Sequence, residues 1–193
     1  MFEVEQKFPV DDADRLQAQL RQLAGGPGQR QDHRDTYFNH PCRDFAETTE
    51  ALRIRMLDDR PMVTYKGAKL PDNEGNRDGI KARRELEWRL DPGDPDGSHF
   101  RELLTSLSFR EVATVAKHRE QFSFVPGVFV GVTLPVAVTL DRVEEVGIYA
   151  EIEIVAADDQ AIGGARDQIA LVARQLGLTD SEPRSYLRLL LGE

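Results

Sequence analysis

The feature that most constrains this chain is a two-residue alternation of apolar with polar, mostly charged, side chains that recurs in separate stretches. Residues 2–8, for example, set two phenylalanines and a valine against two glutamates and a lysine. Successive side chains of a strand point to opposite faces, so each such stretch is predicted to be a strand with one apolar face. Strands are predicted at residues 2–8, 51–57, 62–66, 81–90 and 148–155, and further β-rich runs lie at 32–39, 110–124 and 129–143.

Helical periodicity is rarer than strand alternation in this chain. Residues 11–23 follow an acidic start and end just before Gly25-Gly26, which is a typical helix stop. Three more helices are predicted at residues 96–107, 158–176 and 184–191.

The number and order of the strands favour an antiparallel sheet that is closed or nearly closed. An exposed strand face normally mixes Thr, Ser, Gln and Lys, whereas the polar faces here carry almost exclusively Glu, Arg and Lys. We therefore predict an α+β fold: an eight-stranded antiparallel β-barrel, or tunnel, with a charged interior and helices packed outside. No linker divides the chain, so residues 1–193 are expected to form a single domain.

Composition excludes several classes of protein. The 193 residues include one cysteine, Cys42, which rules out an internal disulfide framework and is typical of a reducing, cytoplasmic location. An excess of 34 acidic over 25 basic residues disfavours a nucleic-acid partner. The most apolar stretch, residues 122–140, is interrupted by Pro and Gly, so no transmembrane helix is predicted. We expect no membrane partner, and a monomer or homodimer.

The charged residues on the polar strand faces form one constellation. Buried charges without partners cost many kcal/mol, so neither sign could be enclosed alone, but together the two signs nearly cancel. The acids are Glu3, Glu5, Glu85, Glu87, Asp141, Glu151 and Glu153; the bases are Lys7, Arg53, Arg55, Lys66, Lys81, Arg83, Lys117 and Arg119.

These residue types suit a particular chemistry. Carboxylates two positions apart on a strand project side by side and can chelate Mg²⁺ or Mn²⁺. Arg binds phosphate bidentately and Lys binds it as a point charge. For any single pair, such as Arg53 and Arg55, a solvated strand face is the simpler explanation. The uniformity over five segments instead favours a site for a polyphosphate bound with its metal.

Short motifs distributed over nearly the whole chain resemble those of one known family. Glu3-Val-Glu5-Gln-Lys7 resembles the ExExK signature of the CYTH superfamily, also called triphosphate tunnel metalloenzymes. This signal is weak alone, but its companions occur in the family's order. They are Asp35-Thr36-Tyr37-Phe38, Leu52-Arg53-Ile54-Arg55, Thr64-Tyr65-Lys66-Gly67, Arg83-Arg84-Glu85-Leu86-Glu87, Lys117-His118-Arg119, Leu140-Asp141-Arg142-Val143, the run from Gly147 to Glu153, and Ser185-Tyr186-Leu187.

The resemblance implies an eight-stranded antiparallel tunnel and a role for each matching residue. It implies a divalent metal held by Glu3, Glu5, Asp141, Glu151 and Glu153, with Glu85 and Glu87 as further metal ligands or partners of the bases. It implies a triphosphate bound by Lys7, Arg53, Arg55, Lys66 and Arg119, with Lys117 and Arg83 close by and Arg184 near a C-terminal basic position; Lys7, Arg53, Arg55 and Lys66 are also the expected catalytic residues.

The sequence thus predicts an Mg²⁺- or Mn²⁺-dependent hydrolase of a small-molecule triphosphate. Thiamine triphosphate, inorganic tripolyphosphate and a nucleoside triphosphate all remain candidate substrates. Two alternatives stay open: a class IV-type adenylyl cyclase that forms cyclic AMP and pyrophosphate, and a polyphosphate- or nucleotide-binding module without turnover.

Overall fold

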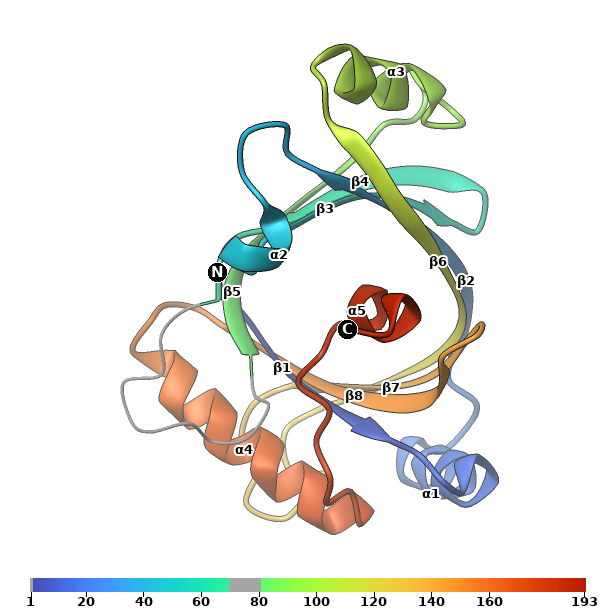
Figure 1. Ribbon diagram of the computed structural model, residues 1–193. Coiled ribbons are helices and arrows are strands. Elements are labelled where there is room, and N and C mark those ends of the chain that lie inside the picture. The colour runs from blue at the N-terminus through green and yellow to red at the C-terminus, as the bar shows by residue number, and fades with distance from the viewer. Residues whose placement is uncertain (1, 70–80) are drawn as a thin grey trace.

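Eight antiparallel strands close into a barrel in the computed structural model, which describes residues 2–69 and 81–193 (Figure 1). Neighbouring strands around the ring follow the order β1-β5-β4-β3-β2-β6-β7-β8, with β8 pairing back to β1. The strands are β1 (Phe2–Pro9), β2 (Gln29–Asn39), β3 (Ala51–Leu57), β4 (Arg60–Lys66), β5 (Lys81–Arg89), β6 (Arg110–Phe124), β7 (Val136–Val143) and β8 (Gly147–Ala156). The predicted fold is therefore confirmed.

Helices cover part of the outside of the barrel. Asp12 begins α1 by accepting a hydrogen bond from the Arg15 N–H at 2.9 Å, and the helix ends at Gly25, whose φ of 72° suits glycine. The helices are α1 (Ala13–Ala24), α2 (Phe45–Thr48), α3 (Ser98–Ser106), α4 (Ala161–Leu176) and α5 (Tyr186–Leu191). No helix in the described part of the chain is long and apolar enough to cross a membrane.

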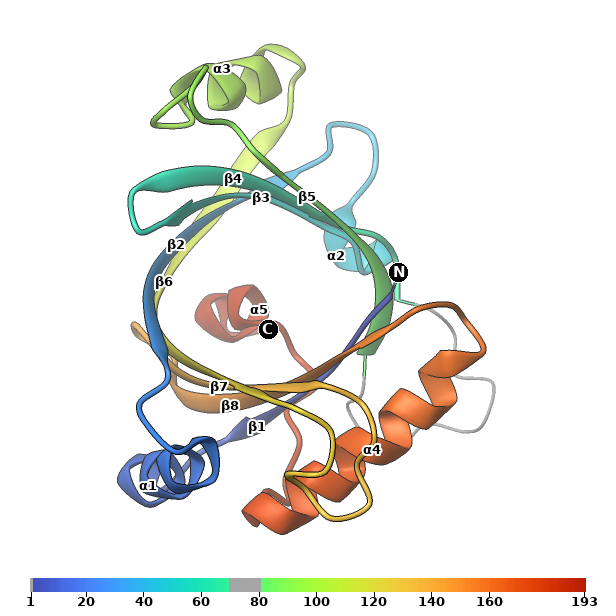
Figure 2. The same cartoon turned by 180° about the vertical axis from the view of Figure 1, so that it is seen from behind.

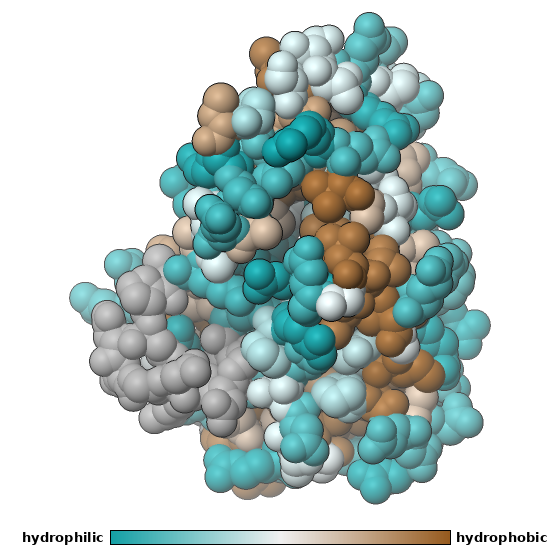
Figure 3. All heavy atoms as spheres, viewed as in Figure 1, coloured by the Kyte–Doolittle hydropathy of each residue, from teal (hydrophilic) through white to brown (hydrophobic). Residues whose placement is uncertain are grey.

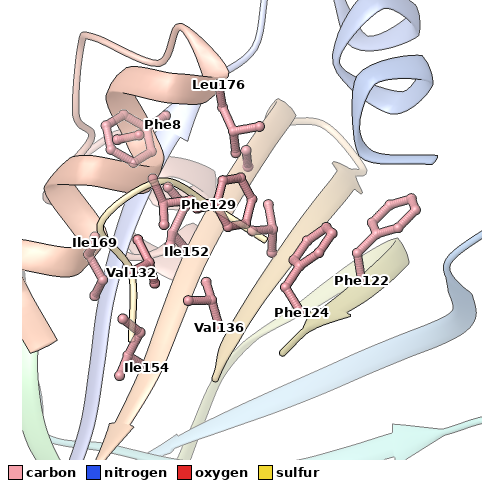
Figure 4. Packing of buried hydrophobic residues seen from close by; sticks show 14 of the residues in the cluster. Phe8, Phe122, Phe124, Phe129, Val132, Val136, Ile152, Ile154, Ile169 and Leu176 are labelled. Atoms are coloured by element: carbon pink, nitrogen blue, oxygen red, sulfur yellow. The ribbon is translucent and has the colours of Figure 1, made fainter. Parts of the chain in front are cut away.

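The main hydrophobic core lies between the outer face of the barrel and α4 and α1 (Figure 4). Ile169 of α4 is fully buried, as is Ile152 of β8, while Phe8 of β1 is 2% exposed. Each large apolar side chain buried in this way contributes roughly 1.5–3 kcal/mol to folding. Because the apolar faces of the strands meet the helices, their charged faces must turn toward the axis of the barrel.

Helix α5 departs from the predicted arrangement, because it lies inside the outline of the barrel rather than against its outer wall (Figures 1 and 2). Its first residue, Tyr186, packs in a cluster with Tyr37, Val115 and Val143, while Ala51 and Tyr149 border the same cluster. Leu187, Leu189 and Leu190 of α5 pack against the same cluster, and this contact removes their apolar surface from water.

Two local predictions were also wrong. Residues 129–135 were expected to extend β7, but this segment turns instead, with Gly131 at a φ of 77°. Gln168 of α4 holds the turn by accepting hydrogen bonds from the N–H groups of Thr133 and Leu134, at 2.7 and 2.9 Å. Helix α2 was missed, since its four residues are too few to show a helical period. The sequence also predicts a polar loop at residues 71–79, and these lie outside the described residues.

Candidate active site in the barrel

The charged residues predicted from the strand alternation gather around one cavity of about 720 Å³. Asp141 lies behind this lining with no exposed surface, and Arg184 does not contribute to it. The predicted residues that do line the cavity are Glu3, Glu5, Lys7, Arg53, Arg55, Lys66, Lys81, Arg83, Glu85, Glu87, Lys117, Arg119, Glu151 and Glu153. The inward direction of the charged faces is therefore confirmed.

One wall of the cavity, formed by β5, β1 and β8, is rich in carboxylates, and we call it the acidic wall. Glu5 lies directly opposite Glu153 in the β1–β8 register. Like charges in such positions repel each other. Lys66, which reaches this wall from β4, forms ion pairs with Glu3 and with Glu85, the latter at 2.9 Å.

The pKa values on the acidic wall show that its negative charge is incompletely neutralised. Burial and the neighbouring Glu5 raise the pKa of Glu3 to about 8, although Lys66 opposes the shift. Burial and Glu3 likewise raise the pKa of Glu153 to about 7. Burial acts in the same sense on Glu5, but Lys66, Lys81 and other nearby cations hold its pKa well below the usual value. The cluster therefore retains a proton near neutral pH. A bound cation would supply the missing positive charge and allow that proton to leave.

The opposite wall, formed by β3, β2, β6 and β7, carries more bases than acids, and we call it the basic wall. Asp35 receives two hydrogen bonds of 2.7 Å from Arg55 and an ion pair of 3.1 Å from Arg53. Asp141 receives hydrogen bonds from Lys117 at 2.8 Å and from Arg119.

Each carboxylate of the basic wall therefore serves two cations, and the surplus positive charge is available to an anion. Burial and the neighbouring Arg119 lower the pKa of Lys117 to about 8. Burial and Lys81 lower the pKa of Lys7 to the same value. A phosphate chain would satisfy these buried ammonium groups.

Asp35 is a buried residue of the candidate site that appears in one of the quoted motifs but was given no role there. It alternates with Tyr37 on the inward face of β2, which is visible in the sequence. Its partners are not visible there, because they depend on the β2–β3 register, in which Asp35 lies opposite Arg55. Burial alone would raise the pKa of Asp35, but Arg53 and Arg55 hold it well below its usual value.

The segment leading into α5 closes part of the lumen near Lys7. The Lys7 ammonium donates a hydrogen bond to the Arg184 carbonyl and lies 4.1 Å from the centre of the Tyr186 ring. The Arg184 side chain points elsewhere, pairing with Glu182 at 2.6 Å. Its backbone, not its guanidinium, thus meets the site. Hydrophobic side chains gather over α5 on this face of the molecule, beside hydrophilic ones (Figure 3).

Carboxylate oxygens are suitable ligands for a hard divalent cation. In this structure, however, several of these carboxylates form ion pairs with basic side chains. Within residues 2–69 and 81–193, no three His, Cys, Asp or Glu side chains are grouped closely enough to hold a metal. Lys66 and Arg119 explain this, since their ion pairs occupy Glu3, Glu85 and Glu151. Burial and neighbouring carboxylates raise the pKa values of Glu3 and Glu153 despite the opposing effect of Lys66, so these oxygen donors would gain from an added cation. Such donors are the ones that Mg²⁺ and Mn²⁺ prefer.

Comparisons with known proteins match the whole described fold. The CYTH domain model matches residues 1–186. A Methanocaldococcus jannaschii protein, provisionally named an adenylate cyclase, is 30% identical over 191 residues, covering 98% of each chain. The adenylate cyclase CyaB of Aeromonas hydrophila is 28% identical over 190 residues, covering 96% of this chain and 86% of that protein. A solved structure from Pyrococcus horikoshii superimposes with a TM-score of 0.81 at 34% identity, covering 98% of both chains.

Proposed function

Since the chain belongs to the CYTH family, whose enzymes act on triphosphates, we propose that it is an Mg²⁺- or Mn²⁺-dependent triphosphatase. The observation that carries the proposal is the pairing of an acidic and a basic wall across one cavity. The acidic wall holds carboxylates with raised pKa values, and the basic wall holds a buried lysine, Lys117, with a lowered one. A polyanion bound together with a divalent cation corrects both imbalances at once.

The basic wall binds and orients the triphosphate in this proposal. Arg53, Arg55 and Arg119 present planar guanidinium groups, which hold phosphate oxygens bidentately, and Lys117 adds a point charge. Asp35 and Asp141 keep these cations extended into the lumen. Because the groups are already fixed by these ion pairs, little reorganisation accompanies the charge shift of phosphoryl transfer.

The acidic wall would hold the metal through Glu3, Glu5 and Glu153, with Glu85, Glu87 and Glu151 beside them. A bound divalent cation neutralises charge on the phosphate oxygens and lowers the barrier to attack. Asp141 is better suited to orienting bases, since Lys117, Arg119 and the Tyr186 hydroxyl all donate to it. Lys66 would turn from the carboxylates to the phosphate chain when both ligands are present.

A second candidate function is cyclisation of ATP, and the names of the two similar sequences favour it. The same walls would then hold the triphosphate of ATP while a ribose hydroxyl, rather than water, attacks. The phosphate-binding groups serve either reaction equally. The charged lining therefore identifies neither the leaving group nor the organic part of the substrate.

Product analysis separates these functions. Purified protein is incubated with tripolyphosphate, thiamine triphosphate or ATP, each with Mg²⁺, Mn²⁺ or excess chelator. We expect metal-dependent release of orthophosphate. Formation of pyrophosphate with cyclic AMP from ATP would replace hydrolysis by cyclisation. Tight binding of tripolyphosphate without turnover of any triphosphate would leave a binding module.

Matched variants tie the activity to the lumen. Arg53→Ala removes an inward guanidinium, whereas Arg84→Ala removes one from the exposed outer face of β5. We expect the first variant to lose hydrolysis and the second to retain it.

A further inference from the structure

His33 has a buried side chain that lines the lumen. It belongs to none of the quoted motifs and has no role in the proposed binding of triphosphate or metal. It lies on β2 between Gln31 and Asp35, lines the cavity and is 3% exposed. Its Nε2 lies 3.1 Å from the Gln31 side-chain oxygen. An amide oxygen can only accept a hydrogen bond, so Nε2 carries the proton and Nδ1 bears a lone pair.

Within residues 2–69 and 81–193, the buried Nδ1 atom of His33 has no hydrogen-bond partner. A buried acceptor without a partner is destabilising, so its presence calls for an explanation. Nδ1 has almost no exposed surface as the side chain stands, so the imidazole would turn slightly toward the lumen to meet a hydroxyl or a water molecule that a ligand brings there.

The position of His33 in the ring places it across the lumen from the acidic wall. Four steps separate β2 from β1 in either direction around the closed order of eight strands, so the two strands face each other. Within the sheet, His33 lies opposite Leu57 of β3 and Lys117 of β6. A triphosphate held between the two walls would therefore have metal-binding carboxylates on one side and this imidazole on the other.

We propose that Nδ1 of His33 is the general base that takes the proton from the attacking water. The inference rests on the proposed triphosphatase function and names the group that activates the nucleophile. The water oxygen forms a bond to the terminal phosphorus, and the bridging P–O bond breaks with its electron pair passing to the leaving phosphate oxygen. The water proton passes to Nδ1, and the imidazolium later returns it to solvent.

The charges around His33 would make this base dependent on substrate. Burial, together with Arg55 of β3 and with Lys117 and Arg119 of β6, lowers the pKa of His33 to about 2, against a smaller opposing effect of Asp35. The three cations are the groups proposed to bind phosphate. When a triphosphate neutralises them, the pKa of His33 should rise toward the range in which an imidazole accepts protons efficiently.

Kinetics of two variants test the role. His33→Asn keeps a hydrogen-bonding group near the Nδ1 position but cannot take up a proton, whereas His33→Gln places its amide nearer the Nε2 position. The matched control is His118→Asn, because His118 is an exposed imidazole on β6 that pairs with Asp32 on the outer surface at 2.6 Å. General base catalysis contributes about 10²–10⁴-fold. We expect both His33 variants to lose that factor in kcat with KM changed less than about threefold, and the control to be unchanged.

The pH profile distinguishes a base from a structural residue. Wild-type kcat should fall on the acidic side of an ionisation that is absent from the residual rate of His33→Asn. A kcat within threefold of wild type for His33→Asn, while the wild type hydrolyses triphosphate, would overturn the proposal and leave the triphosphatase function intact. No hydrolysis by the wild type with any triphosphate would remove both.

Nitrogen NMR supplies a readout that does not depend on turnover. The ¹⁵N signals of His33, assigned by their absence from His33→Asn, should show an unprotonated Nδ1 at neutral pH. Saturating tripolyphosphate without metal should raise the pH at which Nδ1 becomes protonated by more than one unit, with no such change at His118. An unchanged protonation midpoint with tripolyphosphate bound would refute substrate activation of this base.

Discussion

Replacing Asp35 with asparagine isolates the ion pairs that hold the basic wall in place. The side chain is 2% exposed and keeps two guanidinium groups paired, with Arg55 at 2.7 Å and Arg53 at 3.1 Å. Asn has nearly the same shape but no charge, and its amide NH₂ faces donors. Removing one partner of a buried ion pair costs about 3–5 kcal/mol, because the remaining charge is buried without compensation.

The expected loss is large enough to measure by thermal unfolding. For a chain of this size each kcal/mol shifts the melting temperature by about 2–4 °C, so Asp35→Asn should melt about 6–20 °C below the wild type. Asp32→Asn is the control, since it makes the same substitution on the same strand at an exposed pair with His118. Exposed pairs contribute about 0–1 kcal/mol, so this variant should melt within a few degrees of the wild type.

Tripolyphosphate should partly compensate for the loss of Asp35. Its oxygens supply negative charge to Arg53 and Arg55, so the ligand should raise the melting temperature of Asp35→Asn by more than it raises that of the wild type. A ligand at a hundred times its dissociation constant adds about 2.7 kcal/mol. If Asp35→Asn melted together with Asp32→Asn, or gained no more than the wild type from tripolyphosphate, the basic wall would not depend on Asp35 as we argue.

Three further predictions concern the opposite wall and the bases. The raised pKa of Glu3 means that the folded state holds a proton there that the unfolded state releases above pH 4.5. Metal-free protein should therefore lose stability as the pH rises from about 4.5 to 8. Glu3→Gln should reduce that loss in thermal melts recorded across this range. Arg53→Ala and Lys66→Ala should each lower kcat/KM for tripolyphosphate about 10²-fold or more, whereas Arg84→Ala, on the exposed face, should be nearly silent; equal losses for all three would contradict the inward alternation. Hydrolysis should stop in excess chelator and return with Mg²⁺ or Mn²⁺, and Glu5→Gln should need more metal for half-maximal rate, so full activity in chelator would argue against the acidic wall as the metal site.

Strand alternation was sufficient to predict the barrel and the inward direction of its charges. The alternation within each strand identifies its apolar face and its charged face. Because the apolar face is buried against the helices, the charged face points into the barrel. Residues 129–135 were misjudged because Gln168, from a distant helix, satisfies their backbone. Helix α5 was placed outside because an apolar helix face looks the same whether it packs in a lumen or on a wall.

Partnerships across the lumen could not be predicted, because they depend on which strands become neighbours. The pairing of β1 with β5 joins residues about eighty positions apart in the sequence, and nothing local specifies it. For the same reason the sequence assigned Lys66 to phosphate without showing its ion pairs with Glu3 and Glu85. Tyr186 was recognised as part of a motif, but its hydrogen bond to Asp141 required the closed barrel.

The closure of β1 onto β8 has a consequence for how the protein is made. Glu5 leaves the ribosome 148 residues before Glu153, its partner in the sheet. At typical rates of synthesis of 5–20 residues per second, β1 waits roughly 7–30 s for β8 to appear. During that interval β1 can pair with β5, but the ring stays open between β1 and β7. A polypeptide that stops short of β8 therefore lacks Glu151 and Glu153 and, with them, one side of the acidic wall.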